Sequence, residues 1–332
     1  METSMSDLVT HPVRAIAAKD IADARRDRFI LIVTGFIALA ALTSLVTGAI
    51  ALAADVATYN DAKATLLALG KSIDTIAAPD FHPLKLLRGA IEQIEIIGAV
   101  LGILAGFRAA VSERGRQTLA LIMTRPVKSW QFLAGKYLAG VALLSLALFA
   151  VFVAAALALQ VVSGVGLGLG DLGRILIVWF VASAYVLAFY SLTFVLTLWM
   201  KRPANALLIS FAVWLLVVLV APQIGDTLDP DNQVAGGVFK QLQVPKAEED
   251  RIKAGYAAYE TIRNGIEVSS ITKHFERFSF AVLGIKDSYA DKPLGPILIE
   301  KQGDFFWIFL TSLGLAVLMI ARPVNANRLT KE

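Results

Sequence analysis

The 332-residue sequence has no cysteine and few charged residues. The absence of cysteine excludes disulfides, thiolate metal sites and a cysteine nucleophile, and it leaves the redox compartment open. Only 17% of the residues are charged and 57% are hydrophobic, whereas a soluble domain has roughly 25% charged residues. The three histidines, His11, His82 and His274, are too far apart in sequence to suggest a metal motif. The composition therefore favours lipid as the surroundings of much of the chain.

The apolar residues are gathered into runs long enough to cross a bilayer, which takes about 20 helical residues. Charge-free runs cover residues 29–54, 137–170, 175–200, 203–225 and 305–321. A sixth candidate, residues 91–110, has Glu92 and Glu95 at its start and Arg108 near its end. The first run is too long for a signal-peptide core, so we expect it to remain as an anchor. The sequence predicts an all-α integral membrane protein with about six transmembrane helices.

Basic residues are distributed unevenly between the two sides that six spans would separate. One side would hold residues 1–28, 108–136, 201–202 and 322–332, with 16 basic and 7 acidic residues. The other would hold residues 55–88, 171–174 and 226–304, with 15 basic and 18 acidic residues. Because Lys and Arg are retained in short cytoplasmic loops, both termini are predicted to be cytoplasmic in the cell inner (plasma) membrane. No concentrated basic face suggests binding to nucleic acid.

The segments between the spans differ in character. Val13, Ile16 and Ile21 alternate with charged residues at helical spacing, which favours an interfacial helix over an exposed charged tail. Residues 246–284 have interleaved apolar and charged residues without proline, which indicates a helical outer domain.

We therefore divide the chain into an interfacial helix (1–28), span 1 (29–54), an outer segment (55–90), span 2 (91–110), a cytoplasmic coupling loop (111–136), span 3 (137–162), a Gly-rich outer loop (163–174), span 4 (175–200), a cytoplasmic turn (201–205), span 5 (206–225), a small, mainly helical extracytoplasmic domain (226–303), span 6 (304–321) and a cytoplasmic tail (322–332).

The second predicted span carries a stripe of small residues, Gly98, Gly102 and Gly106. Glycine at every fourth position flattens one helical face, so that a neighbouring backbone can approach closely. Glu95 lies on the same face, one turn earlier. With Glu92, it could form part of a pathway or an interhelical lock, or both carboxylates could be hydrated at the outer headgroup level.

Motifs for catalysis are incomplete. Gly70-Lys71-Ser72 ends like a phosphate-binding loop, but Thr65 stands where its first glycine should be. Gly168 to Asp171 reads GLGD, as in intramembrane aspartyl proteases, but no second aspartate lies within a predicted span. We therefore expect no catalytic residue, cofactor or metal in this chain, and no enzyme activity of its own.

The loop between the second and third predicted spans is predicted to contain a short amphipathic helix. Leu119, Ile122 and Met123 have the spacing of one helical face, and Pro126 disfavours continuation of the helix. This face is flanked by charged residues and is predicted to bind a groove on another protein.

The same loop contains Glu113, Thr118, Leu119, Arg125, Pro126, Gly135 and Lys136. With these residues it resembles the corresponding loop in the permeases of type-2 ABC exporters. Gln117 replaces the glycine that usually precedes Thr-Leu in that family. The resemblance implies a coupling helix that docks on a separate ATPase subunit, which binds the ATP and Mg. It also implies a second permease copy, in a homo- or heterodimer. The long outer segments look most like the branch associated with maturation of copper enzymes, and an outer partner protein would fit there.

Two other classes of function fit a membrane protein of this kind. A non-transporting scaffold or sensor would bind a partner through the outer domain. A secondary transporter is less favoured, because internal repeats or charges at the middle of spans are typical of that class and are not evident. Only the ABC exporter requires an ATPase at the helix that contains Leu119.

Overall fold

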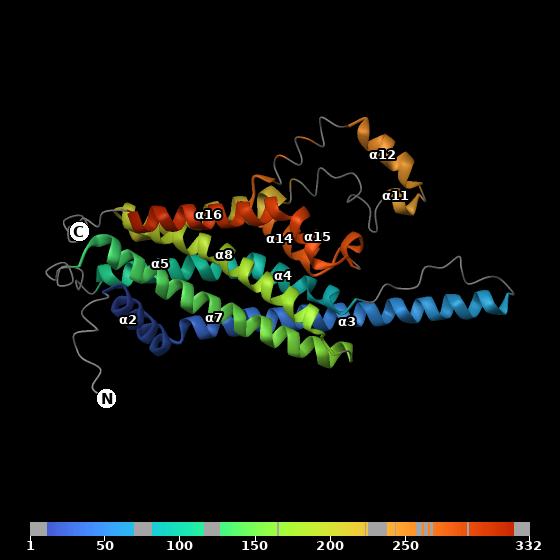
Figure 1. The fold of residues 1–332 in the computed structure, drawn as a ribbon, viewed down its shortest axis with the longest axis horizontal. Coiled ribbons are helices and arrows are strands. Elements are labelled where there is room, and N and C mark those ends of the chain that lie inside the picture. The colour runs from blue at the N-terminus through green and yellow to red at the C-terminus, as the bar shows by residue number, and fades with distance from the viewer. Residues whose placement is uncertain are drawn as a thin grey trace.

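The protein is a bundle of long helices, as shown in Figure 1. The computed structural model describes residues 12–69, 82–115, 127–164, 166–222, 224, 238–242, 244–256, 261, 265, 268–290 and 292–321. Within these ranges there is no strand. Six helices in the described part are long and apolar enough to cross a membrane: Phe29–Ala68, Pro83–Ser112, Ser129–Ser163, Leu169–Trp199, Pro203–Val220 and Gln302–Ala321. The predicted all-α membrane architecture is confirmed.

The spans are joined by shorter helices. An N-terminal helix α2 (Pro12–Asp27) precedes the first span, α3 (Phe29–Ala68). The second span combines η2 (Pro83–Leu87), α4 (Arg88–Gln93), η3 (Ile94–Gly98) and α5 (Ala99–Gly115). Then come α7 (Ser129–Ser163), α8 (Leu169–Trp199), and the fifth span of α9 (Pro203–Trp214) with η4 (Leu215–Val220). The remaining elements are α11 (Val238–Gln241), α12 (Lys246–Ala254), α14 (Ile271–Val282), η6 (Asp287–Tyr289), α15 (Leu294–Glu300) and the sixth span, α16 (Gln302–Ala321).

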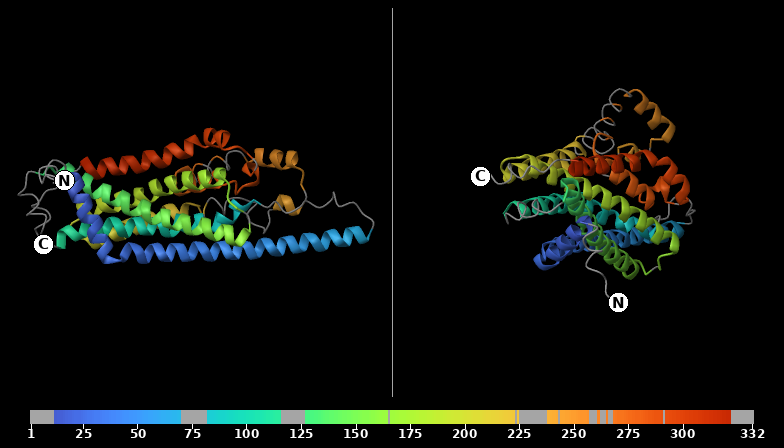
Figure 2. Two further views of the ribbon diagram at one scale, coloured as in Figure 1. Left: turned by 60° about the horizontal axis from the view of Figure 1, so that its bottom comes forward. Right: turned by 60° about the vertical axis from the view of Figure 1, so that its left-hand side comes forward.

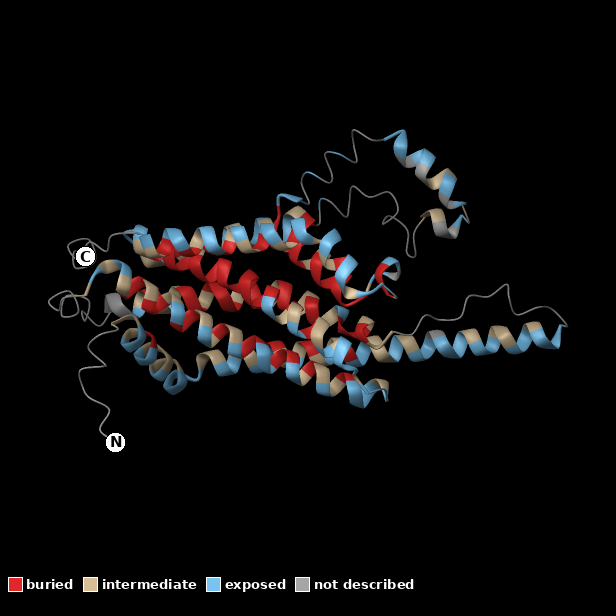
Figure 3. Cartoon of the chain, viewed as in Figure 1, coloured by how far each residue is buried: buried red, intermediate tan, exposed pale blue. Residues whose placement is uncertain are grey.

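Helix α8 is the centre of the bundle. In its most apolar stretch 72% of the residues are buried, compared with 17% for α3 and 28% for α16. Figure 3 shows the buried residues concentrated along the inner faces, whereas the outer helices have exposed apolar side chains. An apolar outer surface of this kind is suited to lipid, because water would disfavour so large an apolar area.

Helix α5 packs directly on the backbone of α8. A Cβ atom at Gly102 would lie 2.5 Å from the carbonyl oxygen of Val186, and one at Gly106 would lie still closer to the carbonyl oxygen of Tyr190. At Gly98 a Cβ atom would lie 3.3 Å from a methyl group of Val186. The glycine stripe therefore faces α8, and side chains larger than hydrogen would push the two helices apart.

Helix α3 is longer than the span that the sequence suggests. We expected the span to end near residue 54, before an outer segment, but the helix continues without a break to Ala68. Its 40 residues correspond to about 60 Å at about 1.5 Å per residue, which is about twice the thickness of the hydrocarbon core. Figures 1 and 2 show its second half extending beyond the other spans.

Helix α14 differs most from the expectation of an outer domain over residues 226–303. It packs into the bundle against α8 and α16, whereas α11 and α12 lie apart from the bundle in Figure 1. Tyr185, in the middle of α8, stacks on Phe275 near the start of α14, with ring centroids 4.7 Å apart. At the other end of α14, Arg174 near the start of α8 donates to the carbonyl of Val282 over 2.7 Å. Helix α14 therefore lies antiparallel to one half of α8.

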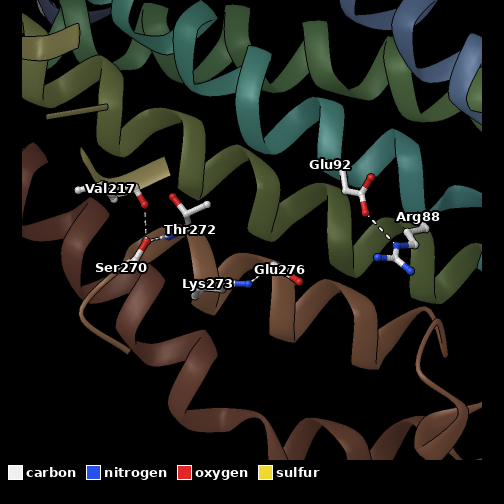
Figure 4. A network of polar contacts seen from close by, with 7 residues as sticks. All are labelled: Arg88, Glu92, Val217, Ser270, Thr272, Lys273 and Glu276. Atoms are coloured by element: carbon white, nitrogen blue, oxygen red, sulfur yellow. Dashed lines mark hydrogen bonds and ion pairs between the residues drawn. The ribbon is translucent and has the colours of Figure 1, made fainter. Parts of the chain in front are cut away.

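Polar contacts fix α14 in this position (Figure 4). Ser270 caps the helix by accepting from the backbone N–H of Thr272, and its hydroxyl donates to the carbonyl of Val217 in η4 over 2.7 Å. Lys273 and Glu276 form an ion pair along α14 with a distance of 2.9 Å. Interleaved charges suggested an outer helix, but this pairing partly neutralises them and lets the apolar face of α14 join the core.

A buried histidine joins α14 to the sixth span. His274 Nδ1 lies 2.6 Å from Asp304 Oδ1 at the start of α16, and His274 Nε2 lies 2.8 Å from the carbonyl oxygen of Val268. Because a carbonyl only accepts, the Nε2 atom carries a proton. Both ring nitrogens therefore have partners, as burial of a polar ring requires.

The connection from α14 to α15 is fixed outside the spans. Tyr289 donates a short hydrogen bond to Glu300, and the ammonium of Lys292 lies 4.8 Å from the Tyr289 ring centroid. Burial, followed by the hydrogen bond to Glu300, raises the pKa of Tyr289 to about 12. The same hydrogen bond lowers the pKa of the exposed Glu300 carboxyl. Both shifts favour the protonated tyrosine and the ionised carboxylate at neutral pH.

The glycine contact predicts a selective effect of adding one methyl group. Gly106→Ala is expected to lower the free energy of unfolding by about 1–3 kcal/mol, because the new atom overlaps the α8 backbone. Gly314→Ala in α16 is the matched control, since a Cβ atom there has no neighbour within 4 Å. The measurement is unfolding of the full chain by SDS titration in mixed micelles. Equal stability of the two variants would contradict the packing described.

Candidate functional site

The predicted coupling segment falls mostly outside the described residues. Glu113 lies in the last turns of α5, and nothing is described of its side chain. The other predicted coupling positions, Thr118, Leu119, Ile122, Met123, Arg125 and Pro126, lie outside the described ranges. The structure does describe the two helices that carry the segment, α5 and α7, at the end of the bundle where α2 also lies (Figure 1).

Helix α7 has a well-defined start. The backbone N–H of Lys128 donates to the Gln131 side chain over 2.9 Å, which satisfies a group that would otherwise lack a partner at the helix end. Gly135 follows in the second turn. A Cβ atom at Gly135 would lie 2.8 Å from Cβ of Ile16 and 2.9 Å from the carbonyl oxygen of Val13. Gly135 therefore allows α2 to cross α7 at close range.

Lys136, the next residue, forms a buried ion pair with α2. Its Nζ atom lies 2.9 Å from Asp20 Oδ2, and the two side chains are only 2% and 14% exposed. A lysine at such a depth requires a carboxylate, because desolvation of a lone ammonium is costly. The Gly-Lys dipeptide thus has two physical roles, since the glycine admits α2 and the lysine holds it.

The start of α7 is also attached to α8. The hydroxyl of Tyr190 donates to the carbonyl of Lys136 over 3.0 Å. One turn further along α7, a Cβ atom at Gly140 would lie 2.6 Å from the Tyr190 ring. Tyr190 therefore contacts both α7 and, through its backbone, Gly106 of α5. One residue of α8 lies between the two helices that carry the coupling segment.

A second charged contact joins α5 to the junction of α2 and α3. Arg108 forms a hydrogen-bonded ion pair with Asp27, and both side chains are about half exposed, at 47% and 48%. The Arg108 guanidinium also lies 4.5 Å from the ring centroid of Phe29. Arg28, between α2 and α3, has a left-handed backbone with φ 55°, so the chain turns sharply and α2 crosses the bundle rather than extending α3.

These helices surround a cavity of about 830 Å³. It is lined by α2, the start of α3, the end of α5 that leads into the coupling segment, the start of α7 and Tyr190 of α8. We call this space the inner cavity. It separates α5 from α2, although both pack tightly against other helices.

Glu92 and Glu95 occupy different surroundings. Glu92 is half exposed and pairs with Arg88, with 2.9 Å between Nε and Oε1 (Figure 4). Glu95 is buried with 8% exposure, and its carbonyl accepts a 2.8 Å hydrogen bond from Tyr185. The two carboxylates therefore do not form one site. Hydration at the headgroup level suits Glu92 but not Glu95.

Glu95 lies in a π-helical segment, η3. A π-helical turn deprives carbonyls of their usual donors, and such turns are frequent at functional sites. Here the donors come from other helices, since Tyr185 bonds to Glu95 and the Trp214 indole bonds to the carbonyl of Ile96 over 3.3 Å. Ser270 likewise donates to Val217 in the second π-helical segment, η4. Three spans and α14 thus meet around Tyr185.

Sequence reasoning missed Asp20, Tyr185 and Tyr190. Asp20 was one of several charges on an interfacial helix, and only its depth against Lys136 distinguishes it. The two tyrosines lie within a predicted span, where a buried hydroxyl needs a partner. That requirement was a usable signal, although it does not say which helix provides the partner. Among the described residues, no group of three or more His, Asp or Glu side chains could hold a metal ion.

Six apolar spans in the described residues, one of them the central helix α8, define a multi-pass membrane protein. A family model described as ABC-2 family transporter protein matches residues 14–322. The match covers nearly the whole sequence, so the chain belongs to the ABC-2 transporter family. Permeases of this family in general pair with an ABC ATPase and form dimers. A search of curated proteins gave no match.

The buried ion pair predicts a large effect when one partner is removed. Lys136→Met should lower the free energy of unfolding by about 3–5 kcal/mol, because it leaves Asp20 charged and buried. The double variant Asp20→Leu with Lys136→Met should recover most of this loss. The measurement is SDS unfolding of the full chain in mixed micelles.

An exposed ion pair provides the control. Arg251 and Glu248 lie 2.6 Å apart with side chains 78% and 44% exposed, so Arg251→Met should change stability by less than about 1 kcal/mol. If Lys136→Met lowers the free energy of unfolding no more than Arg251→Met does, the ion pair of Lys136 with Asp20 does not hold α2 on α7.

Proposed function

We propose that this chain is the permease subunit of an ABC exporter, in which residues 113–127 dock on a separate ATPase. The family match over residues 14–322 carries the proposal. The arrangement of α5, α7 and α2 at one end of the bundle supports it, because a segment between α5 and α7 would be presented there. In this proposal both termini are cytoplasmic and the membrane is the inner (plasma) membrane.

The chain itself has no catalytic role in this proposal. ATP and Mg would be bound by the partner subunit, and ATP would act through its different affinity for two conformations of the complex. A displacement of the coupling segment would move α5 and α7. The glycine contact of α5 would transmit the movement to α8, and Gly135 and Lys136 of α7 would transmit it to α2. A second permease copy would complete the pathway.

The outer parts support an extracytoplasmic partner. Helix α3 continues well beyond the length that a bilayer requires, and α11 and α12 lie apart from the spans (Figure 1). We extend the proposal to the branch of the family associated with maturation of copper enzymes, where the outer segments would contact the partner. The same features favour the alternative, a non-transporting scaffold or sensor that binds a partner outside. A secondary transporter remains the third choice.

The test is co-expression with candidate ATPases of the same genome, followed by copurification and ATP turnover. Leu119→Asp should reduce copurification at least tenfold, about 1.4 kcal/mol of binding, because it places a charge on the apolar docking face. Glu113→Ala should retain ATPase binding better than Leu119→Asp does. It should also weaken the effect of the permease on ATP turnover by the bound ATPase.

Leu69→Asp is the matched control. Leu69 is 64% exposed at the far end of α3, so the same change there should leave ATPase binding unaltered. Failure of every candidate ATPase to bind would favour the scaffold. Equal binding by the Leu119 and Leu69 variants would show that an ATPase docks elsewhere.

A further inference from the structure

The inner cavity has the size and lining of a small-molecule site. Its volume of about 830 Å³ lies within the roughly 300–1,000 Å³ that is usual for ligand pockets. The floor is apolar and includes Ala105, Ala139 and Leu144, all of which are buried. Such a floor fits an apolar portion of a ligand, because binding there removes apolar area from water.

The walls of the inner cavity are charged, with both signs present. Three acidic residues, Asp20, Asp23 and Asp27, come from α2. Their spacing of three and four residues places them on one face of that helix. Three basic residues, Arg26, Arg108 and Lys136, come from α2, α5 and α7. The formal charge of the lining is therefore zero, which fits a ligand that is neutral overall but carries separated charges.

The position of the inner cavity identifies the surroundings from which a ligand would come. The charged residues of α2 and the junction end at Arg28, and α3 then exposes Leu31, Ile32 and Phe36 at 72%, 65% and 59%. This change from charged to exposed apolar side chains is typical of the boundary between headgroups and acyl chains. Phe29 and Ile30, at that boundary, line the inner cavity, so a phospholipid of the adjacent leaflet would have its headgroup at the charged walls.

We propose that the inner cavity binds a zwitterionic phospholipid with a primary ammonium, of the phosphoethanolamine class. The ammonium would donate to the carboxylates of α2, and the phosphate would accept from Arg26 and Arg108. Arg108 can serve both Asp27 and a phosphate, because a guanidinium has five N–H donors and the pair with Asp27 is half exposed. The glycerol region would lie over the apolar floor.

Other headgroups fit less well. A choline headgroup has the same charges but no N–H donor, so it would add no hydrogen bond to the carboxylates of α2. An anionic headgroup has no ammonium for the carboxylates of α2, and a lining with no net charge does not balance its negative charge. Recognition of the headgroup therefore gives an order of affinity, with phosphatidylethanolamine first.

The bound lipid would touch both helices that carry the coupling segment. Arg108 belongs to α5, and Lys136 and Ala139 belong to α7. The inference does not depend on which ATPase binds, because it rests on the cavity and on the membrane location of the chain. Failure of the ATPase experiment would not contradict the lipid site, and failure of the lipid experiment would not contradict the docking of an ATPase.

The test is native mass spectrometry of the full chain in detergent, with phosphatidylethanolamine, phosphatidylcholine and phosphatidylglycerol of identical acyl chains. The first phosphatidylethanolamine molecule that binds should do so at least about fivefold more tightly than the first molecule of either other lipid, a difference of about 1 kcal/mol. The double variant Asp23→Asn with Arg26→Gln should bring the three affinities within about twofold. Equal affinities in the natural chain would overturn the proposal, as would preference for phosphatidylglycerol.

A matched control changes charges at the same end of the bundle but outside the inner cavity. Lys201→Gln with Arg202→Gln lies at the exposed connection between α8 and α9, and it should preserve the preference. If the cavity variant loses its fold, photocrosslinking of the natural chain with a headgroup-labelled phosphatidylethanolamine replaces it. Crosslinks in α2 and at the end of α5 would support the proposal, and crosslinks confined to other segments would overturn it.

Discussion

The contact of α5 with the α8 backbone determines where the other helices lie. Gly102 and Gly106 bring the two helices so close that a single methyl group would overlap the carbonyls of Val186 and Tyr190. In a bilayer, where lipid competes for apolar surface, close van der Waals packing of this kind is a principal source of helix association. With α5 in place, α8 is buried on several sides, so the hydroxyls of its buried tyrosines take their partners from within the bundle.

That requirement explains the polar contacts around Tyr185 and Tyr190. Each tyrosine hydroxyl donates to a carbonyl of another span, Glu95 in η3 and Lys136 in α7. The π-helical segments supply carbonyls that lack their usual donors, and Trp214 and Ser270 satisfy two of them. Irregular backbone is thus tolerated inside the bundle because neighbouring helices complete its hydrogen bonds.

The spans and the glycine stripe could be predicted because both depend on local patterns. The length of a charge-free run indicates whether a helix can cross the bilayer, and glycine at every fourth residue indicates a flat helical face. Neither inference requires knowledge of the neighbouring helix. The position of α14 could not be predicted in this way, because Lys273 and Glu276 neutralise each other only once the helix is formed. The depth of Glu95 and the pairing of Asp20 with Lys136 depend on contacts between distant segments. The length of α3 was missed because charges such as Asp61 suggested that the span had ended, although they do not end a helix.

The two helices that carry residues 116–126 both contact Tyr190 of α8, but they differ in their other contacts. Helix α5 is held on α8 by glycine contacts that admit no intervening side chain, and α7 is held on α2 by Gly135 and the buried Lys136 pair. Between α5 and α2 lie the inner cavity and the half-exposed pair of Arg108 with Asp27. An exposed pair of this kind costs little to separate, whereas a buried pair costs several kcal/mol. A force applied to the segment would therefore change the spacing across the inner cavity before it separated α5 from α8 or α7 from α2.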